Sequence, residues 1–494
     1  MDENHNCVIT KYIIIHSKAY SPAIFPSPSQ YTVLSKEVTH HMFTRYWNPY
    51  LAMILAGVLA ALYFGITGTV WAVTGEFTRY GGHLLHAVGI DTSGWAYFNL
   101  VSMNGTPLTR TDGWIVIGML GGALMTVLLS RSFKIRMPQQ KRRLVQGFIG
   151  GIIAGFGARL ALGCNLAAFF TGVPQFSFHA WIFMFATAVG TYLGVKVVNT
   201  RWWRGRPNLK KVTATKKAFA TDGTTKTNLT NSTPHPTTAI THTTIQPNTD
   251  SRTSQTCTSQ SRTPQSRTPQ SRSIQPILGT IVAVLLTALA VFYFATARPM
   301  LGVALLAGVG FGVLIERGQI CFTSAFRDLW ISGRAVMTKA IAVGMAVSVV
   351  LTFLFLYTGS TALIKIAAPG TLVGGLLFGL GIVLAGGCET GMMYRMMEGQ
   401  VLFLVVGIGN VLGATLLAYG WDHLGIAALL VAGWQPINLI SSWGAAWALI
   451  GTLAMLGIWY ALAHWWEKQY RYGRGLKIGG GEKGEATNAK EVYS

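Results

Sequence analysis

The stretch "LAGGCETGMMYR", residues 384–395, places a thiol, a carboxylate and a guanidinium directly after an apolar run. A second stretch, "LALGCNLAAFF" at residues 160–170, repeats the Gly-Cys arrangement in the first half of the chain. Glycines before each cysteine and polar or aromatic residues after it predict helices that stop near Cys164 and Cys388. Inside a membrane such broken helices occur only where they are buried in protein or line a water-filled cavity.

The composition of the whole chain supports a location in the membrane. Its 494 residues are 51% hydrophobic and only 11% charged, with a mean hydropathy of +0.41, whereas soluble domains carry about 25% charged residues. Apolar segments approach the roughly 20 residues that cross a bilayer. The ten predicted passes are residues 51–73, 113–129, 146–162, 180–198, 277–295, 301–315, 340–356, 372–387, 401–419 and 445–463. The prediction is an all-α multispanning membrane protein in which some passes are re-entrant half-helices.

The two Gly-Cys stretches belong to a longer internal repeat. A shift of 224 residues places Gly150, Gly151, Gly155, Gly157, Ala161, Gly163 and Cys164 on Gly374, Gly375, Gly379, Gly381, Ala385, Gly387 and Cys388. If the basic loops lie in the cytoplasm, the number of passes between them implies that the two copies cross the membrane in opposite directions. The sequence therefore predicts an inverted repeat whose broken helices meet near the bilayer midplane, where such proteins bind substrate.

The distribution of the strong positive charge indicates membrane topology rather than nucleic-acid binding. Of the net +22, residues 200–275 carry twelve Lys/Arg against two Asp, and residues 131–143 carry six basic residues and no acid. Basic clusters beside apolar passes mark cytoplasmic loops. We therefore expect the basic loops and both termini in the cytoplasm, with no nucleic-acid partner.

The same features divide the chain into five parts. We predict a polar, disordered N-terminal extension (1–41), a first membrane repeat (42–200) and a flexible, basic Ser/Thr/Gln/Pro-rich cytoplasmic linker (201–275). A second repeat with a final helix (276–466) and a basic cytoplasmic tail (467–494) follow. The linker cannot bury enough apolar surface to offset its ordering entropy.

Three cysteines at membrane depth are the candidate substrate contacts: Cys164, Cys321 and Cys388. Thiols are weak, soft donors, so several of them in succession suit a soft anion that must not be trapped. The candidate supporting residues are Gly163, Gly386, Gly387, Arg159, Arg317, Glu389 and Arg395. The alternatives are that the cysteines only pack as small apolar residues, and that Arg159, Arg327 and Arg395 only form structural ion pairs with Glu389, Glu316 or Asp328.

Two further expectations concern Cys321 and metals. In "ERGQICFTSAFRD", residues 316–328, Arg317 and Cys321 would share one face of a continuous helix at i, i+4. None of the five cysteines forms a C-x-x-C pair, so we expect neither a dithiol redox motif nor a zinc site. We expect no cofactor and no metal.

Long stretches of this sequence resemble the YeeE/YedE family of sulfur-transport membrane proteins, and most of all its YedE branch, which is associated with selenium metabolism. The resemblance rests on "YFGITGTVWAVTGEFTRYGG", "GGIIAGFGARLALGCNLAAFFTGVPQFSFHAW", "IERGQICFTSAFRDLWISGRA" and "GIVLAGGCETGMMYRMMEGQ". It implies an inverted-repeat fold of the bacterial inner membrane in which Cys164, Cys321 and Cys388 relay thiosulfate by S–H···S contacts. It also implies a TusA-like sulfurtransferase carrier as a cytoplasmic partner. The place around Glu76–Tyr80 that would match Cys321 in the first half has no thiol.

Together these observations predict a transporter or channel, not an enzyme, for a small sulfur- or selenium-containing anion. Two other readings stay open at this point. One is a membrane sulfur or selenium transferase that forms a persulfide on Cys321 beside Arg317, and the other is a membrane subunit that recruits the carrier protein.

Overall fold

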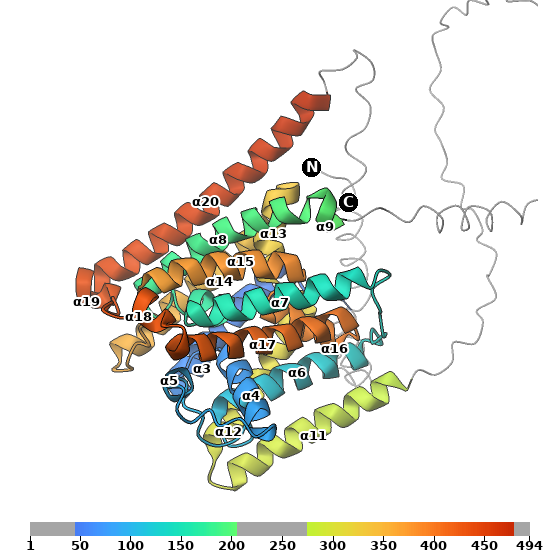
Figure 1. Cartoon of the computed structure of the whole chain (residues 1–494), viewed down its shortest axis with the longest axis vertical. Coiled ribbons are helices and arrows are strands. Elements are labelled where there is room, and N and C mark those ends of the chain that lie inside the picture. Colours follow the sequence, from blue (N-terminus) through green and yellow to red (C-terminus); the bar gives the residue numbers. More distant parts are fainter. Residues whose placement is uncertain (1–44, 205–273, 479–494) are drawn as a thin grey trace, which may run out of the picture. The chain divides into compact units, whose positions relative to one another are not determined.

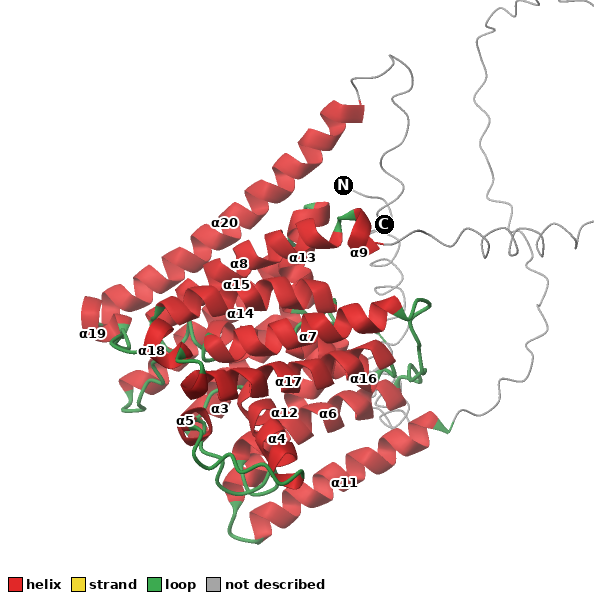
Figure 2. Cartoon of the chain, viewed as in Figure 1, coloured by secondary structure: helices red, strands yellow, loops and turns green. Residues whose placement is uncertain are grey.

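The computed structural model of the chain describes residues 45–204 and 274–478, and every regular element in these ranges is a helix (Figures 1 and 2). The first part contains α3 (Pro49–Thr67), α4 (Thr74–Ala87), α5 (Ala96–Leu100), α6 (Thr111–Leu129), α7 (Arg142–Leu160), the π-helix η1 (Asn165–Phe170) and α8 (Phe178–Val198). The second contains α11 (Gln275–Ala295), α12 (Pro299–Arg317), α13 (Phe322–Ser332), α14 (Val336–Tyr357), α15 (Pro369–Ala385), α16 (Glu389–Met397), α17 (Val401–His423), α18 (Ile426–Leu430), α19 (Leu439–Trp443) and α20 (Ala445–Ile478).

The short helix α9 (Arg201–Arg204) belongs to a separate unit, residues 201–273, and is described by itself. Within it the rings of Trp202 and Trp203 lie 5.9 Å apart. The predicted N-terminal extension, most of the predicted linker and the end of the predicted tail lie outside the described residues. Helix α20 continues to Ile478, beyond residue 466, where the sequence placed the end of the second repeat.

Ten helical segments in the described ranges are long and apolar enough to cross a membrane, and they coincide with the ten predicted passes. The prediction of an all-α multispanning membrane protein is therefore confirmed. Helices α11 and α20 lie at opposite edges of the bundle in Figure 1. Only 11% and 17% of the residues in their apolar segments are buried, the smallest shares among the ten. Most of their apolar side chains would therefore face the lipid of the membrane.

Three of the ten passes are broken, as predicted for the Gly-Cys stretches. Helix α7 stops at Leu160 before η1, α12 stops before α13, and α15 stops before α16. In each case the residue immediately before the resumed helix is a cysteine: Cys164, Cys321 and Cys388. Each break also needs a left-handed backbone residue, namely Leu162 (φ 55°), Gln319 (φ 48°) and Gly386 (φ 89°).

Glycines let α7 and α15 cross with their backbones in contact. A Cβ added at Gly150 would lie 2.3 Å from the Ala385 nitrogen, and one added at Gly374 would lie 2.5 Å from the Ala161 nitrogen. Both distances are too short for any side chain, so only glycine fits. The start of α7 lies against the end of α15 and vice versa, which makes the two helices antiparallel. The contacts are also reciprocal, because each partner is replaced by its equivalent in the sequence repeat.

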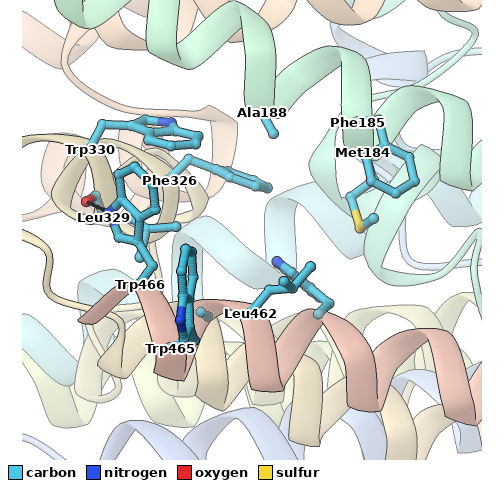
Figure 3. Close-up of a pocket in the computed structure, with 11 residues that line it drawn as sticks. Met184, Phe185, Ala188, Phe326, Leu329, Trp330, Leu462, Trp465 and Trp466 are labelled. Carbon is cyan, nitrogen blue, oxygen red and sulfur yellow. Dashed lines mark hydrogen bonds between the residues drawn. The ribbon is translucent and has the colours of Figure 1, made fainter. Parts of the chain in front are cut away.

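The last helix is fastened to α13 and α14. Lys339 Nζ on α14 lies 2.8 Å from a Glu467 carboxylate oxygen on α20, and Trp466 Nε1 donates to the Leu329 carbonyl at 3.0 Å. Between α8, α13 and α20 an apolar groove of about 220 Å³ remains, lined by aromatic rings that include Phe326, Trp330 and Trp465 (Figure 3). Its lining is apolar enough for a lipid chain to fill it.

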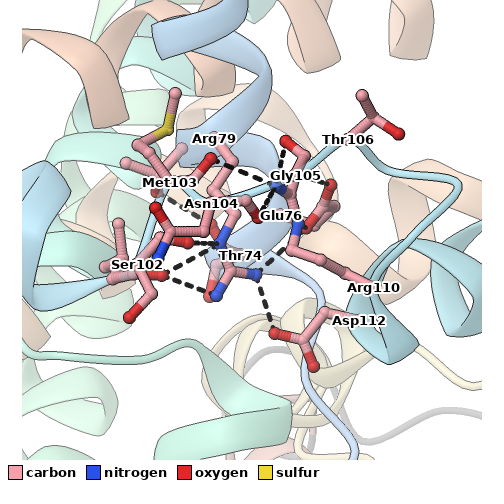
Figure 4. A network of polar contacts seen from close by, with 12 residues as sticks. Thr74, Glu76, Arg79, Ser102, Met103, Asn104, Gly105, Thr106, Arg110 and Asp112 are labelled. Atoms are coloured by element: carbon pink, nitrogen blue, oxygen red, sulfur yellow. Dashed lines mark hydrogen bonds and ion pairs between the residues drawn. The ribbon is translucent and has the colours of Figure 1, made fainter.

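A buried ionic network fixes α4 against the segment that leads into α6 (Figure 4). The Glu76 carboxylate, which is 1% exposed, accepts from Arg79 at 3.0 Å and from Arg110 at 2.8 Å. Arg79 also lies 2.7 Å from Asp112 and donates to the Val101 carbonyl. The charges of Glu76 and Arg79 are thereby compensated locally, so their role is to hold this segment in place.

Candidate functional site

The structure brings two of the three candidate thiols together. The Sγ atoms of Cys321 and Cys388 lie 4.0 Å apart, and each side chain is 1% exposed. Gly391 makes this approach possible, because a Cβ there would lie 2.6 Å from Cys321 Sγ. The breaks after α12 and α15 therefore meet at their cysteines.

Cys164 lies in the same apolar core and is fully buried. Its break approaches that of Cys321 through aromatic rings. Phe169 and Phe170, on η1, lie 6.1 Å and 6.0 Å from Phe322, the residue after Cys321. All three broken passes thus converge on one buried region.

Trp71 joins this region from the loop between α3 and α4. Its ring stacks on Phe311 with centroids 3.8 Å apart and meets the edge of Phe170 at 5.9 Å. Its indole N–H donates to the Met119 sulfur at 3.2 Å. Sequence reasoning missed Trp71, since a tryptophan in a membrane protein is ordinarily an interfacial or packing residue.

Two arginines neutralise the end of α15 just before Cys388. Arg143 donates to the carbonyls of Leu384 (3.0 Å) and Ala385 (3.2 Å), and Arg395 donates to the Gly386 carbonyl at 3.0 Å. The last carbonyls of a helix have no partner within it and carry partial negative charge. The guanidinium groups satisfy them. Sequence reasoning assigned Arg143 to a topology cluster and missed this contact, because its five basic neighbours at residues 131–142 hide it.

The predicted glycines accommodate these side chains. A Cβ at Gly386 would lie 2.5 Å from Arg143 Nη2, and one at Gly387 would lie 2.7 Å from the Phe403 ring. The Arg395 guanidinium lies 5.1 Å from the centre of that same ring. Both glycines therefore make room for the groups that surround the break.

Several buried polar atoms around the breaks have no partner among the described residues. They are Nε of Arg159, one carboxylate oxygen of Glu389, the amide oxygen of Asn410, and both the oxygen and the nitrogen of the Asn165 amide. Arg159 Nη2 donates to Thr74 at 2.7 Å, and Asn410 donates to Glu389 at 3.1 Å. Buried polar groups are normally paired, and unpaired ones call for a water or a ligand. Asn165, which directly follows Cys164, was not a sequence candidate.

Only one of the three arginines Arg159, Arg327 and Arg395 forms the structural ion pair that the sequence analysis left open for them. Among the described residues the ion pairs include Arg327 with Asp328 at 2.9 Å, but none that involves Arg159 or Arg395. The alternative therefore holds for Arg327 alone.

The expectation that Arg317 and Cys321 share a helical face is wrong. Helix α12 ends at Arg317 and α13 begins after Cys321, with Gln319 in the left-handed region between them. The Arg317 guanidinium instead pairs with the adjacent Glu316. The i, i+4 rule applies only inside a continuous helix, and the sequence signal for this break was weaker than for the two Gly-Cys breaks.

A lysine that sequence reasoning missed reaches the Cys164 break. Lys365, between α14 and α15, donates from Nζ to the Ala167 carbonyl at 3.0 Å. The pKa of Lys365 is lowered to about 8, mainly by burial and then by the Arg159 guanidinium, while Cys164 opposes both effects. The only available signal was one isolated lysine in the apolar stretch "TALIKIAAPG".

Within the described residues, no group of three or more His, Cys, Asp or Glu side chains is placed to hold a metal ion.

Comparisons with known proteins agree with the resemblance seen in the sequence. The profile of the family described as "Sulphur transport" matches residues 6–193 and 317–483. The "Probable transporter YedE" of Salmonella typhimurium is 47% identical over 378 residues, 76% of this chain and 82% of that relative. The protein of the same name in Escherichia coli is 46% identical over 78% of this chain and 84% of its own length.

More distant relatives are named for their substrate. The "Thiosulfate transporter TsuA" of Escherichia coli is 36% identical over 138 residues, 25% of this chain and 39% of that relative. The protein of that name in Spirochaeta thermophila is 38% identical over 117 residues, 23% of this chain and 36% of its own length. No solved structure matches this chain. The family profile covers most of both membrane halves, and so the chain belongs to the sulphur transport family that comprises the YeeE and YedE proteins.

Proposed function

We propose that this protein conducts a small sulfur anion of the thiosulfate class across the bacterial inner membrane, with Cys164, Cys321 and Cys388 as successive thiol donors. Membership of the sulphur transport family supports transport of a sulfur compound. The single observation that carries the thiol relay is the 4.0 Å approach of Cys321 and Cys388 at two helix breaks inside the membrane-spanning bundle.

The chemistry of the site favours a soft anion over a hydrated cation. Small hard cations prefer carboxylate and carbonyl oxygen ligands, whereas this core presents three thiols and several guanidinium groups beside the single carboxylate of Glu389. A terminal sulfur, or a terminal selenium, accepts weak S–H hydrogen bonds, and weak contacts in series allow an ion to leave as well as to enter. The relatives named as thiosulfate transporters favour the sulfur anion.

An inverted repeat is part of the proposal. The reciprocal, antiparallel crossing of α7 and α15 supports it, because Gly150 meets Ala385 as Gly374 meets Ala161. The basic segments at residues 131–143 and 201–275 would then lie in the cytoplasm together with both termini. A TusA-like carrier that receives the anion there is the proposed partner.

The transferase reading has lost its main support, because Arg317 pairs with Glu316 and does not share a helix with Cys321. Mass spectrometry after exposure to thiosulfate distinguishes the two functions. A persulfide on Cys321 that is required for activity would favour the transferase, and uptake without any adduct would favour transport.

The deciding experiment is uptake of labelled thiosulfate, selenite and selenosulfate into proteoliposomes. We expect thiosulfate uptake well above that of empty vesicles, and a loss of at least about tenfold for Cys164→Ala, Cys321→Ala and Cys388→Ala. Cys257→Ala, in the predicted linker, is the matched control and should transport normally. Absence of uptake by the wild type would overturn the function, and normal uptake by all three variants would overturn the relay.

A further inference from the structure

Lys365 places a cation directly beside the break that carries Cys164. Its Nζ lies 3.0 Å from the Ala167 carbonyl on η1, and a Cβ added at Gly163 would lie only 2.8 Å from Nζ. The ammonium group therefore lies against the residues on both sides of Cys164. Gly163 leaves the space that this approach requires.

The backbone around Lys365 is fixed on the segment that follows η1. Leu363 donates its N–H to the Gln175 side chain at 2.9 Å, and Lys365 donates its N–H to the Ser177 hydroxyl at 3.3 Å. Ile366 forms a β-bridge with Pro436. The ammonium is thus positioned by the fold, as a binding group should be.

The hydrogen-bonding capacity of this cation is largely unused. An ammonium has three N–H donors, and among the described residues it has one acceptor, Ala167, and no ion pair with a carboxylate. Arg143 at the other Gly-Cys break differs, because its guanidinium donates to the carbonyls of Leu384 and Ala385. Lys365 is half-buried in the segment between α14 and α15, and a positioned ammonium with unused N–H donors is a place where an anion can bind through charge-assisted hydrogen bonds.

Asn165 supplies a second, independent observation at the same break. Its side chain is 1% exposed, and neither its amide nitrogen nor its amide oxygen has a partner among the described residues. It directly follows Cys164 in the sequence. Segment 163–167 thus carries the thiol of Cys164 and the unpaired amide of Asn165, and the ammonium of Lys365 contacts the same segment.

We propose that Lys365 and Asn165 form the anion-recognition site of the transporter, binding the oxygen atoms of a sulfur oxyanion while Cys164 faces its terminal sulfur. This inference rests on the proposed function and deepens it. It assigns the ligand to oxyanions that carry a terminal sulfur. On the predicted topology the site is the outer mouth of the path, since the segment between α14 and α15 is extracytoplasmic.

The test measures binding separately from transport. Labelled thiosulfate is titrated onto purified full-length protein by equilibrium dialysis, and uptake is measured in proteoliposomes. For Lys365→Met we expect the Kd and the KM to rise at least about tenfold, the loss typical of a charge-assisted hydrogen bond. Lys365→Arg should stay within about threefold of the wild type.

Two further variants keep the test independent of folding. Gly163→Ala retains the lysine, but its Cβ would lie 2.8 Å from Nζ and 3.0 Å from the Ala168 nitrogen, so we expect weaker binding, and thermal stability is measured beside the Kd. Lys196→Met removes an exposed lysine that lies over Tyr192 and should leave both constants unchanged.

The outcomes separate the two claims. Binding that is weakened in Lys365→Met supports the recognition site even if the wild type shows no uptake, which would refute transport alone. An unchanged Kd in Lys365→Met, or no binding by the wild type, overturns the site. Lower thermal stability of Lys365→Met with an unchanged Kd would make Lys365 a structural cap of η1 and would also overturn it.

Discussion

The sulfur atoms of Cys321 and Cys388 lie 4.0 Å apart, although 67 residues separate the two cysteines in the chain. Each is the residue before a helix that starts within a membrane pass, α13 and α16. A disulfide requires an S–S distance of about 2.05 Å, so an approach of about 2 Å would join them. The position of the two sulfurs can therefore be tested by chemical oxidation.

We predict that copper–phenanthroline oxidises Cys321 and Cys388 to one intramolecular disulfide, the oxidant taking up the two electrons and the two thiol protons passing to solvent. The bond should appear by peptide mapping under non-reducing conditions. It should also block thiosulfate uptake, and dithiothreitol should restore it. Cys388→Ser, which removes one partner, is the control for the peptide map and should form no such bond with Cys321. A bond from Cys388 to Cys164 instead would contradict the arrangement described.

The crossing of α7 and α15 predicts a strong effect of a single methyl group. Gly374→Ala would place a Cβ 2.5 Å from the Ala161 nitrogen and 2.7 Å from the Gly157 carbonyl oxygen, both of them backbone atoms that cannot move aside. We expect a loss of stability of about 1–3 kcal/mol, the usual cost of overpacking, measured as a lower melting temperature in detergent. Gly457→Ala on α20, where a Cβ would meet nothing within 4 Å, should not be destabilised. Equal melting temperatures of the two variants would contradict the close crossing.

Much of the fold could be predicted because its signals are local. The lengths of the apolar segments predicted all ten passes, and the Gly-Cys pairs predicted the helix breaks at Cys164 and Cys388. The predicted pass 301–315 ended before Cys321, but the turn that separates Arg317 from Cys321 was not predicted, since it depends on a left-handed Gln319, a residue with no strong turn signal. Arg317 was consequently assigned to a helical face that does not exist.

The site was harder to predict because its members meet only through tertiary contacts. Lys365 and Ala167 are 198 residues apart, and Arg143 lies 241 residues from Leu384. Neither pair has a spacing that a sequence can display. A basic residue within a cluster reads as a topology signal even when, like Arg143, it caps the end of another helix.

The ionic network around α4 predicts unequal effects for two conservative substitutions. Glu76→Gln would leave Arg79 and Arg110 without their buried partner, which typically costs about 3–5 kcal/mol. Asp112→Asn removes a carboxylate whose side chain is 34% exposed, and pairs of that kind contribute about 1 kcal/mol or less. Melting temperatures of the purified variants check the order. A smaller loss for Glu76→Gln than for Asp112→Asn would show that Glu76 is not the centre of the network.

The lowered pKa of Lys365, about 8, predicts that transport depends on pH. Arg159, Cys164 and His179 are the titratable or charged groups that act on it. The ammonium attracts an anion only while protonated, so uptake should be high below pH 8 and fall as pH rises through it. From pH 7 to pH 9 the charged fraction drops roughly tenfold, and uptake at subsaturating thiosulfate should fall by a similar factor.

Lys365→Arg provides the control for this pH dependence, because a guanidinium stays charged throughout the range. Its uptake should be nearly constant between pH 7 and pH 9. The residual uptake of Cys164→Ser should retain the wild-type fall, since this variant removes the neighbouring thiol while keeping the lysine. If Lys365→Arg falls as steeply as the wild type and Cys164→Ser does not fall, the titrating group is the thiol. The positive charge of Lys365 would then have no part in recognising the anion.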